Sequence, residues 1–275
     1  MIERRLKDAV YGLAIGDACG VPFEFKERGS FIASGMTGYG THFQPEGTWS
    51  DDTSMALAIC DSIREQGRID CVDIRKKFRA WIDDARYTAN GVVFDFGATT
   101  YYALQQGKGL NGPSNKGNGS IMRAIPLAFT DATDEEVGEV SAITHSHVVV
   151  REGCQYYIQI AKKLLEGREL ADILRDYSHI TRGPYERLSK VAELREVEID
   201  GSGYVASTLE AALWAVVNSG SFKDAILRAV NLGDDTDTVA AVAGGLAGII
   251  YGIEGMPADW VDTLRNKELI DSCLF

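Results

Sequence analysis

The sequence has 275 residues, which is long enough for one large domain or two small ones. Hydrophobic residues make up 45% of it and charged residues 25%, the balance of an ordinary globular protein. Its 40 acidic and 28 basic side chains give a net charge of -12 with no basic stripe, which argues against nucleic acid as a partner. Five cysteines without CxxC spacing indicate free thiols in a reducing compartment, so we expect a cytoplasmic protein.

Helical periodicity begins at the N-terminus, where apolar residues repeat at i, i+3 and i+4 over residues 4–18. Asp17 interrupts the apolar part of this segment, which therefore makes a poor signal peptide. The same periodicity predicts helices over residues 54–65 and 71–85.

The stretch that leads into the predicted helix at residues 54–65 is Gly47–Leu57, and it reads GTWSDDTSMAL. Ser50 is placed to cap the helix, and Asp51 and Asp52 would then lie in its first turn. The helix dipole stabilises acids at that position by about 0.3–1 kcal/mol each. One acidic helix start is common in proteins of any function, so this motif alone does not indicate a site.

A glycine-rich stretch occupies the middle of the chain. Gly107, Gly109 and Gly112 form a literal GxGxxG, but no strand precedes it and Pro113 follows at once, so a dinucleotide-binding fold is not indicated. The GNGS tetrapeptide at Gly117–Ser120 can be a flexible loop with a helix cap, or a backbone that approaches a phosphate. Composition alone favours the flexible loop.

In the second half of the chain, TDEE from Thr133 has the pattern of a capping box, and Ser221 is placed to cap a further helix. A short hairpin around Asp200-Gly201 is one strand candidate. No low-complexity linker divides the chain, so we predict an all-α fold, a compact single-domain orthogonal helical bundle over residues 1–275. Periodicity adds three helices to it, over residues 156–167, 206–219 and 221–233.

The D-D-T motif occurs a second time, as Asp234-Asp235-Thr236, and again leads into a run of small residues. The apolar stretch that follows, residues 239–253, has 15 residues, whereas a membrane span needs about 20. We therefore predict a buried helix at this position and no membrane partner.

If the two helix starts meet in space, their carboxylates need a counter-charge. Each pair at about 4 Å repels by about 4 kcal/mol at an effective dielectric constant near 20, and neither motif contains lysine or arginine. The available ligands are all oxygens, which suit Mg²⁺ or Mn²⁺ and not zinc. Four carboxylates carry enough charge for two divalent ions, about 3.5–4 Å apart in known dinuclear sites.

Four segments, in this order, resemble the ADP-ribosylglycohydrolases, a family that includes the dinitrogenase reductase-activating glycohydrolases of bacteria. They are GLAIGDACGVPFEF at Gly12–Phe25, GTWSDDTSMAL at Gly47–Leu57, GNGSIMRAIPLA at Gly117–Ala128 and GDDTDTVAAVAGGLAG at Gly233–Gly248. Weaker similarities are FDFGATT from Phe94, THSH from Thr144 and GSGYVASTLEAALWA from Gly201, so the resemblance extends over nearly the whole chain.

The resemblance implies a helical fold with a dinuclear metal site at helix N-termini, holding two Mg²⁺ with Mn²⁺ as the alternative. The implied metal ligands are Ser50, Asp51, Asp52, Asp235, Asp237 and Thr238. Ser50 stands where the family more often has threonine, which keeps the hydroxyl, and Asp234 lies outside the ligand set.

Glu24 matches a family acid near the metals and Asp95 another near the scissile ribose, and which of them moves the proton stays open. The residues themselves allow another interpretation, in which Glu24 is a surface carboxylate and Asp95 caps a helix at Ala98–Leu104. The resemblance reverses the preference at GNGS, which would hold the diphosphate. Arg123 can pair with a phosphate or with a core carboxylate, and we favour structural support. The implied substrate-binding residues are Gly97, Gly117, Asn118, Gly119, Ser120, Met122, His145 and Tyr204.

The function that the resemblance implies is Mg²⁺-dependent hydrolysis of the glycosidic bond between ADP-ribose and a modified side chain. The reaction passes through an oxocarbenium-like state, and Glu24 or Asp95 would help to deprotonate the attacking water. We expect a monomer that acts on an ADP-ribosylated protein or an ADP-ribose conjugate, with an arginine linkage favoured over a serine-type O-linkage.

Two other classes of function are compatible with the same residues. A toxin-immunity or catalytically silent protein would bind a partner without hydrolysis, although the intact acidic set argues against lost catalysis. A Mg²⁺-dependent phosphatase or phosphodiesterase would share the metals, but it would have no evident use for GNGS.

Overall fold

α-Helices make up the regular structure of residues 2–275, the part of the chain that the computed structural model describes. These residues contain no β-strand, only isolated bridges, so the all-α prediction is confirmed. The six helices expected from periodicity are all present. The helices are α1 (Ile2–Gly20), α2 (Asp51–Gln66), α3 (Cys71–Asp84), α4 (Ala98–Gln106), α5 (Asp134–Ser141), α6 (Val148–Leu165), α7 (Leu170–Arg175), α8 (Val205–Val217), α9 (Phe222–Val230), α10 (Thr236–Tyr251), α11 (Ala258–Thr263) and α12 (Lys267–Cys273).

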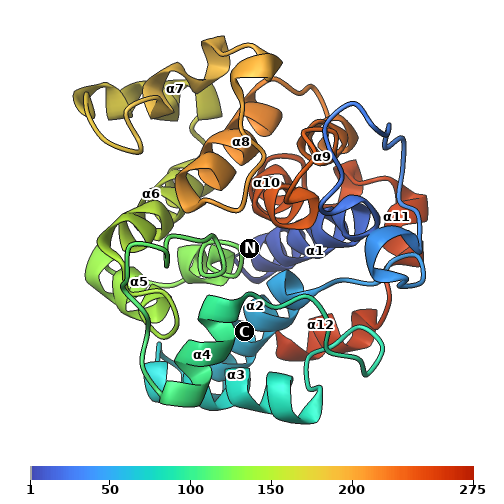
Figure 1. Cartoon of the computed structure of the whole chain (residues 1–275), viewed down its shortest axis with the longest axis vertical. Coiled ribbons are helices and arrows are strands. Elements are labelled where there is room, and N and C mark those ends of the chain that lie inside the picture. Colours follow the sequence, from blue (N-terminus) through green and yellow to red (C-terminus); the bar gives the residue numbers. More distant parts are fainter. Residues whose placement is uncertain (1) are drawn as a thin grey trace.

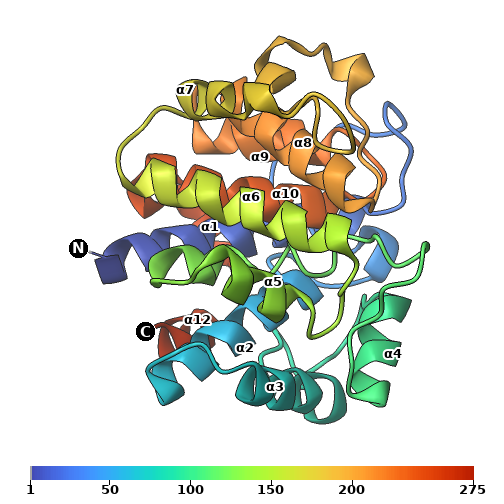
Figure 2. The same ribbon diagram turned by 90° about the vertical axis from the view of Figure 1, so that its left-hand side faces the viewer.

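Helices α1 and α10 lie against one another at the centre of the molecule (Figures 1 and 2). Glycines allow this contact, because a Cβ on Gly12 would lie 2.2 Å from the carbonyl oxygen of Gly244. A Cβ on Gly16 would lie 2.0 Å from the carbonyl oxygen of Ala240. The small residues in both segments therefore bring two backbones into direct contact, with the C-terminal end of α1 beside the start of α10. Helix α2 meets α10 much less extensively.

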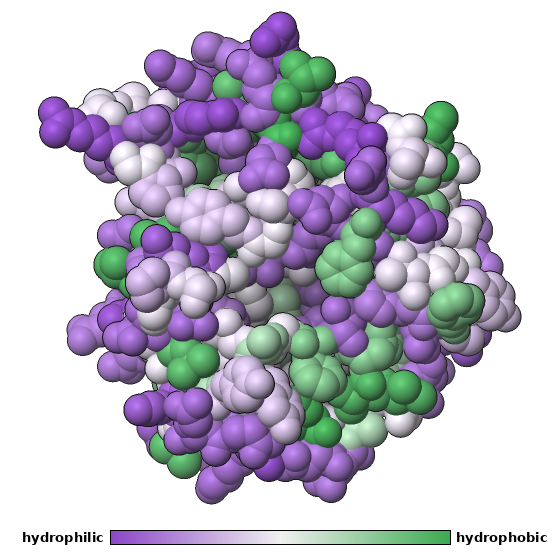
Figure 3. Space-filling view, in the orientation of Figure 1, coloured by the Kyte–Doolittle hydropathy of each residue, from purple (hydrophilic) through white to green (hydrophobic). Residues whose placement is uncertain are grey.

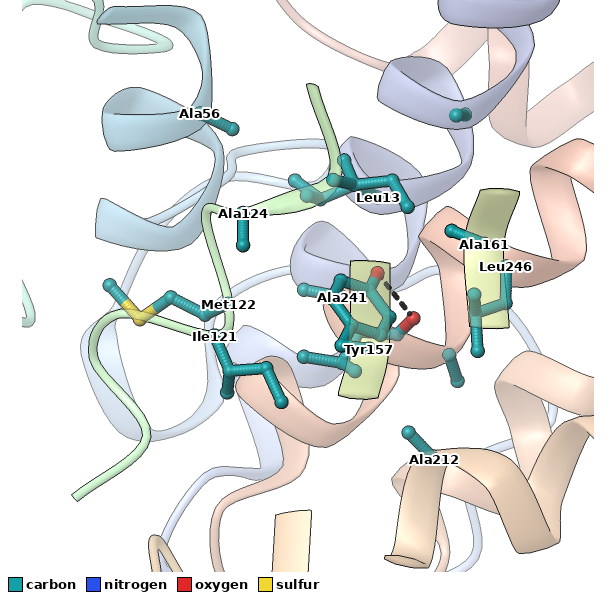
Figure 4. Packing of buried hydrophobic residues seen from close by; sticks show 14 of the residues in the cluster. Leu13, Ala56, Ile121, Met122, Ala124, Tyr157, Ala161, Ala212, Ala241 and Leu246 are labelled. Carbon is teal, nitrogen blue, oxygen red and sulfur yellow. Dashed lines mark hydrogen bonds between the residues drawn. The ribbon is translucent and has the colours of Figure 1, made fainter. Parts of the chain in front are cut away.

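The other helices surround this central pair. Figure 2 shows α7, α8 and α9 on one side of it and α2, α3, α4 and α12 on the other, with α5 and α6 across the front. Their buried apolar side chains form one continuous cluster from Leu6 to Cys273. Figure 4 shows that alanines such as Ala161 and Ala241 let helices approach closely, while the buried Tyr157 hydroxyl donates to the Val242 carbonyl at 3.0 Å.

The predicted helix caps at Thr133 and Ser221 are both present. Thr133 and Glu136 form a capping box at the start of α5, and the Ser221 hydroxyl accepts from the Asp224 N–H at the start of α9. The prediction of a hairpin around Asp200-Gly201 is wrong. The Asp200 carboxylate accepts hydrogen bonds within the turn, including one from the Ser202 N–H at 3.1 Å, so these backbone groups are not available for a strand ladder.

The segment between α1 and α2, residues 21–50, has little regular structure. Phe25, Tyr39 and Phe43 all have left-handed backbones there, with φ of 62°, 67° and 54°. That conformation is unfavourable for a bulky residue and costs about 1–3 kcal/mol at each position. A search of residues 2–275 for a helix both long and apolar enough to span a membrane finds none, and α10 is buried from Thr236 to Ile249.

Candidate active site

Two acidic turns that are far apart in the sequence meet in the fold. We call Ser50–Thr53 the first acidic turn and Asp234–Thr238 the second. The Thr238 hydroxyl lies 3.5 Å from Asp52 Oδ2, and one carboxylate oxygen each of Asp17, Asp52 and Asp237 lie within 4.8 Å of one another. The close packing of α1 against α10 brings about this meeting, since it places the start of α10 beside the C-terminal end of α1.

Asp17 of α1, and not Ser50, caps the helix that carries the first acidic turn. Both oxygens of the Asp17 carboxylate accept from the Ser50 N–H, at 2.9 and 3.0 Å, and Oδ2 also accepts from the Thr53 N–H and hydroxyl, at 3.1 and 2.6 Å. Ser50 stands at the N-cap position but accepts no capping hydrogen bond. Its hydroxyl donates to Asp52 Oδ2 at 3.0 Å, so Ser50 orients a carboxylate of the cluster.

Replacement of Asp17 by alanine is expected to destabilise the fold by about 3 kcal/mol or more in the presence of Mg²⁺. The substitution leaves two buried N–H groups and one hydroxyl without an acceptor, at about 1–3 kcal/mol each. Urea unfolding followed by circular dichroism measures the loss. Asp8→Ala on the same helix is the control, because among the described residues Asp8 accepts one N–H, from Ile253, and its loss should cost clearly less. Equal losses in the two variants would contradict this role for Asp17.

The second acidic turn is fastened to the segment that carries Glu24. The Phe25 N–H donates to the Asp234 carbonyl at 2.7 Å, and the Asp234 N–H donates to the Lys26 carbonyl at 2.9 Å. Asp234 has a left-handed backbone with φ of 65° and an exposed side chain, so it lies outside the cluster. This backbone pairing brings Glu24 and Asp235 into the lining of the same pocket.

Three carboxylate oxygens in the acidic turns are out of contact with solvent and have no hydrogen-bond partner, namely Asp52 Oδ1, Asp235 Oδ1 and Asp237 Oδ2. Among the described residues, no lysine or arginine nitrogen comes within 4.0 Å of a carboxylate in either turn. Burial raises the pKa of Asp51, Asp52, Asp235 and Asp237, and neighbouring carboxylates raise it further. Oxygen ligands with unsatisfied charge fit a hard divalent cation such as Mg²⁺ or Mn²⁺.

A pocket of about 330 Å³ opens above this cluster, and Asp51, Asp235 and Thr238 form its base. Figure 3 shows the face of the molecule that is hollowed at its centre. Glu24 and Asp95 line the pocket, and both structural alternatives for them are wrong. Glu24 is buried rather than a surface carboxylate, and Gly97 occupies the N-cap position of α4 while Asp95 faces the pocket.

His42 joins the two acids of the pocket. Its Nε2 contacts Glu24 Oε2 and lies 3.8 Å from Asp95 Oδ2. Burial, and then the charge of Asp95, raise the pKa of Glu24 to about 11. Among the described residues, His42 is the only one with a basic nitrogen within 4.0 Å of either acid.

The GNGS loop forms the opposite wall of the pocket. Gly119 approaches His145 so closely that a Cβ would lie 2.8 Å from the imidazole Cε1. The Thr144 hydroxyl accepts from Arg123 at 2.7 Å and lies 2.8 Å from His145 Nδ1. This hydrogen bond fixes the orientation of the imidazole ring. Burial, and then Arg123, lower the pKa of His145 to about 3, so the ring is a neutral hydrogen-bond donor.

Arg123 supports this wall from inside. Its side chain is buried, donates to the Gly119 carbonyl at 2.8 Å, and lies over the ring of Phe78 at 4.5 Å. No carboxylate pairs with it within 4.0 Å among the described residues. Arg123 therefore holds the glycine loop in place and does not reach the pocket.

Most of the predicted site residues lie at the pocket, and the others fall into two groups. Ser50, Asp52 and Asp237 lie buried beneath it. Ser120 and Tyr204 do not line it: the Ser120 hydroxyl contacts Ser141 at 2.9 Å, and Tyr204 stands at the N-cap of α8. The predicted residues that line the pocket are Glu24, Asp51, Asp95, Gly97, Gly117, Asn118, Gly119, Met122, His145, Asp235 and Thr238.

Sequence reasoning missed two ionisable residues of the site, Asp17 and His42. A signal for Asp17 existed, because an acid within the apolar part of a helix is rarely buried without a partner. No comparable signal marked His42, which lies in an irregular segment and reaches Glu24 only through the turn formed by residues 39–44.

Known proteins resemble this chain along nearly its whole length. A family model described as ADP-ribosylglycohydrolase matches residues 1–274. The ADP-ribosylarginine hydrolase Tri1 of Pseudomonas putida (strain GB-1) is 39% identical over 281 residues, covering 97% of this chain and 76% of the relative. ADP-ribosyl-[dinitrogen reductase] glycohydrolase of Rhodospirillum rubrum is 29% identical over 283 residues, covering 97% and 92%. A solved structure described as an ADP-ribosylglycohydrolase-related protein complex has a TM-score of 0.84 at 29% identity, covering 99% of this chain and 96% of that one.

Proposed function

The chain belongs to the ADP-ribosylglycohydrolase family and is a hydrolase of glycosidic bonds, and from this premise we propose that it removes ADP-ribose from arginine side chains of modified proteins. The arginine linkage is supported by the similarity to a named ADP-ribosylarginine hydrolase along almost the whole chain. One observation carries the proposal: two acidic turns, about 180 residues apart in the sequence, meet beneath a pocket lined by Glu24 and Asp95.

The acidic turns are proposed to hold two Mg²⁺, with Mn²⁺ as the alternative. Support comes from the three buried carboxylate oxygens that lack a hydrogen-bond partner and from the raised pKa of the surrounding acids. When bound, such ions orient hydroxyl groups of the substrate and activate water. The proposed ligands are Ser50, Asp51, Asp52, Asp235, Asp237 and Thr238.

The side chains of the pocket suit the remaining chemistry. Positive charge develops at the anomeric carbon in the transition state, and the carboxylates at the bottom of the pocket stabilise that charge. Glu24 and Asp95 both line the pocket and are the two candidates to accept a proton from the attacking water, which is typically worth about 10²–10⁴-fold in rate. Glu24 can do so only with the cations bound, because their charge lowers a pKa that burial and Asp95 otherwise raise. His42 lies between Glu24 and Asp95 and holds Glu24 in position.

The glycine loop suits the part of the substrate that does not react. Gly117, Gly119 and His145 line the pocket, where backbone N–H groups and a neutral imidazole would bind an anionic group without adding a formal positive charge. The Asn118 N–H does not take part, because it donates to the Gly203 carbonyl at 3.0 Å. We propose that the whole chain works as one catalytic domain, because α1, α2 and α10, which carry the acids, span nearly all of it.

The proposal is tested with two peptides, one ADP-ribosylated on arginine and one on serine, incubated with the protein and Mg²⁺. Free ADP-ribose measured by chromatography should appear at least tenfold faster from the arginine-linked peptide. EDTA should stop the release, and an excess of Mg²⁺ should restore it. Faster release from the serine-linked peptide would replace the arginine assignment, and no release from either peptide would refute the proposed activity.

A further inference from the structure

Aromatic side chains at the mouth of the pocket remain exposed to solvent. Phe25 and Phe96 line the pocket, yet they are 67% and 40% exposed. Phe43 and Tyr101 are 80% and 39% exposed and belong to the same two segments of the chain. We call these four residues the aromatic rim. Figure 3 shows apolar side chains next to the hollow on this face of the molecule.

Contacts between neighbouring rings order much of the rim. His42 lies between Phe25 and Phe94, with ring centroids 6.1 Å and 5.4 Å away. Phe96 is stacked on Tyr101, with centroids 6.0 Å apart and planes inclined by 28°. These contacts order Phe25, Phe96 and Tyr101, and Phe25 and Phe96 also line the pocket. Phe43 follows His42 directly in the chain.

The backbone conformation of the rim indicates that the exposed rings have a role in binding. Phe25 and Phe43 have left-handed backbones, which bulky residues rarely adopt. Phe25 is held there by its N–H bond to the Asp234 carbonyl, and Phe43 follows the turn that brings His42 to Glu24. An exposed aromatic ring adds no packing to the core that would offset the backbone strain, and strain of this kind is typical of ligand-binding sites.

The size of the pocket decides what reaches the rim. About 330 Å³ is near the lower end of the range for small-molecule pockets, roughly 300–1,000 Å³, so the pocket cannot also admit a polypeptide. A modified side chain can therefore enter the pocket while its polypeptide stays outside, next to the exposed rings of Phe25 and Phe96. Aromatic faces attract guanidinium groups, and aromatic residues are enriched at protein interfaces. The net charge of -12 also favours a basic peptide.

We propose that the aromatic rim binds the polypeptide that carries an ADP-ribosylated arginine, so that the enzyme prefers modified protein over free ADP-ribosylarginine. This inference rests on the proposed function. It assigns Phe43 and Tyr101 to recognition of the peptide alone, because neither residue lines the pocket.

The test compares Phe43→Ser, Tyr101→Ser and the double variant on two substrates, an arginine-ADP-ribosylated peptide and free ADP-ribosylarginine. For the peptide, KM should rise at least tenfold in the double variant while kcat changes less than twofold. For free ADP-ribosylarginine, kcat/KM should stay within twofold of wild type. Tyr101→Phe should restore the peptide KM, since it keeps the ring. Val72→Ser, another exposed apolar position, is the control and should change neither value.

Two outcomes overturn the inference. An unchanged peptide KM in the double variant would show that the rim contributes nothing to binding. An equal loss on both substrates would show that the rim belongs to the ADP-ribose pocket, and circular dichroism distinguishes this result from misfolding. If a variant misfolds, inhibition of the wild-type enzyme by the unmodified peptide decides instead, and absence of inhibition counts against the rim. Failure of the proposed function looks different, because wild type would then release no ADP-ribose from either substrate.

Discussion

Asp52→Asn and Asp237→Asn are each expected to reduce the kcat/KM for ADP-ribose release by about 10²–10³-fold or more. Removal of one electrostatic contact to the transition state typically lowers the rate by about this factor. Both carboxylates are buried and each has an oxygen without a hydrogen-bond partner, so hydrogen bonding does not account for the whole of either charge. Release of ADP-ribose from an arginine-linked peptide measures the effect.

The same variants should have opposite effects on stability with and without metal. In EDTA they should melt at a higher temperature than wild type. A buried acid with a raised pKa must either stay charged beside other carboxylates or bind a proton on folding, and asparagine does neither. In Mg²⁺ wild type should be the more stable protein, because only it retains the full set of ligands. Differential scanning fluorimetry under the two conditions shows whether the order reverses.

Asp234→Asn is the matched control for these variants. Its side chain is exposed and outside the cluster, and asparagine tolerates the left-handed backbone found there. Both activity and melting temperature should stay close to those of wild type. If Asp237→Asn kept wild-type turnover, or its melting order did not reverse, Asp237 would not be a metal ligand.

Gly16→Ala should destabilise the fold by about 3 kcal/mol or more, at the upper end for an overpacked position. The new Cβ would lie 2.0 Å from the carbonyl oxygen of Ala240 and 2.5 Å from its carbon, and neither backbone atom can move without separating α1 from α10. Activity should fall with stability, since Asp17 is the next residue and the second acidic turn lies at the start of α10. Urea unfolding followed by circular dichroism measures the change.

Gly220→Ala is the control for the glycine substitution. A Cβ at Gly220 meets no atom within 4 Å, and its backbone is not left-handed, so the unfolding free energy should change by less than about 0.5 kcal/mol. If the two substitutions had equal effects, close backbone contact between α1 and α10 would not be what holds the acidic turns together.

Local patterns in the chain were enough to predict most helices and their caps. Periodicity places apolar residues on one face of a helix, and capping side chains bond to N–H groups two or three residues away, so both signals act over short distances. The hairpin around Asp200-Gly201 failed because the Asp200 side chain, rather than another strand, bonds the turn. A strand ladder depends on a distant partner, which a local pattern does not identify.

The acids of the site were visible in the residue order, since D-D-T before a run of small residues occurs twice. Their meeting was not, because it depends on glycines of α1 and α10 that let two backbones touch. Asp17 as the cap of α2, and His42 between Glu24 and Asp95, likewise come from segments that are distant in the chain. Residue types therefore determined which chemical groups are available, while helix packing determined which of them form one site. The reason is that carboxylates interact over a few ångströms of space, whatever their separation along the sequence.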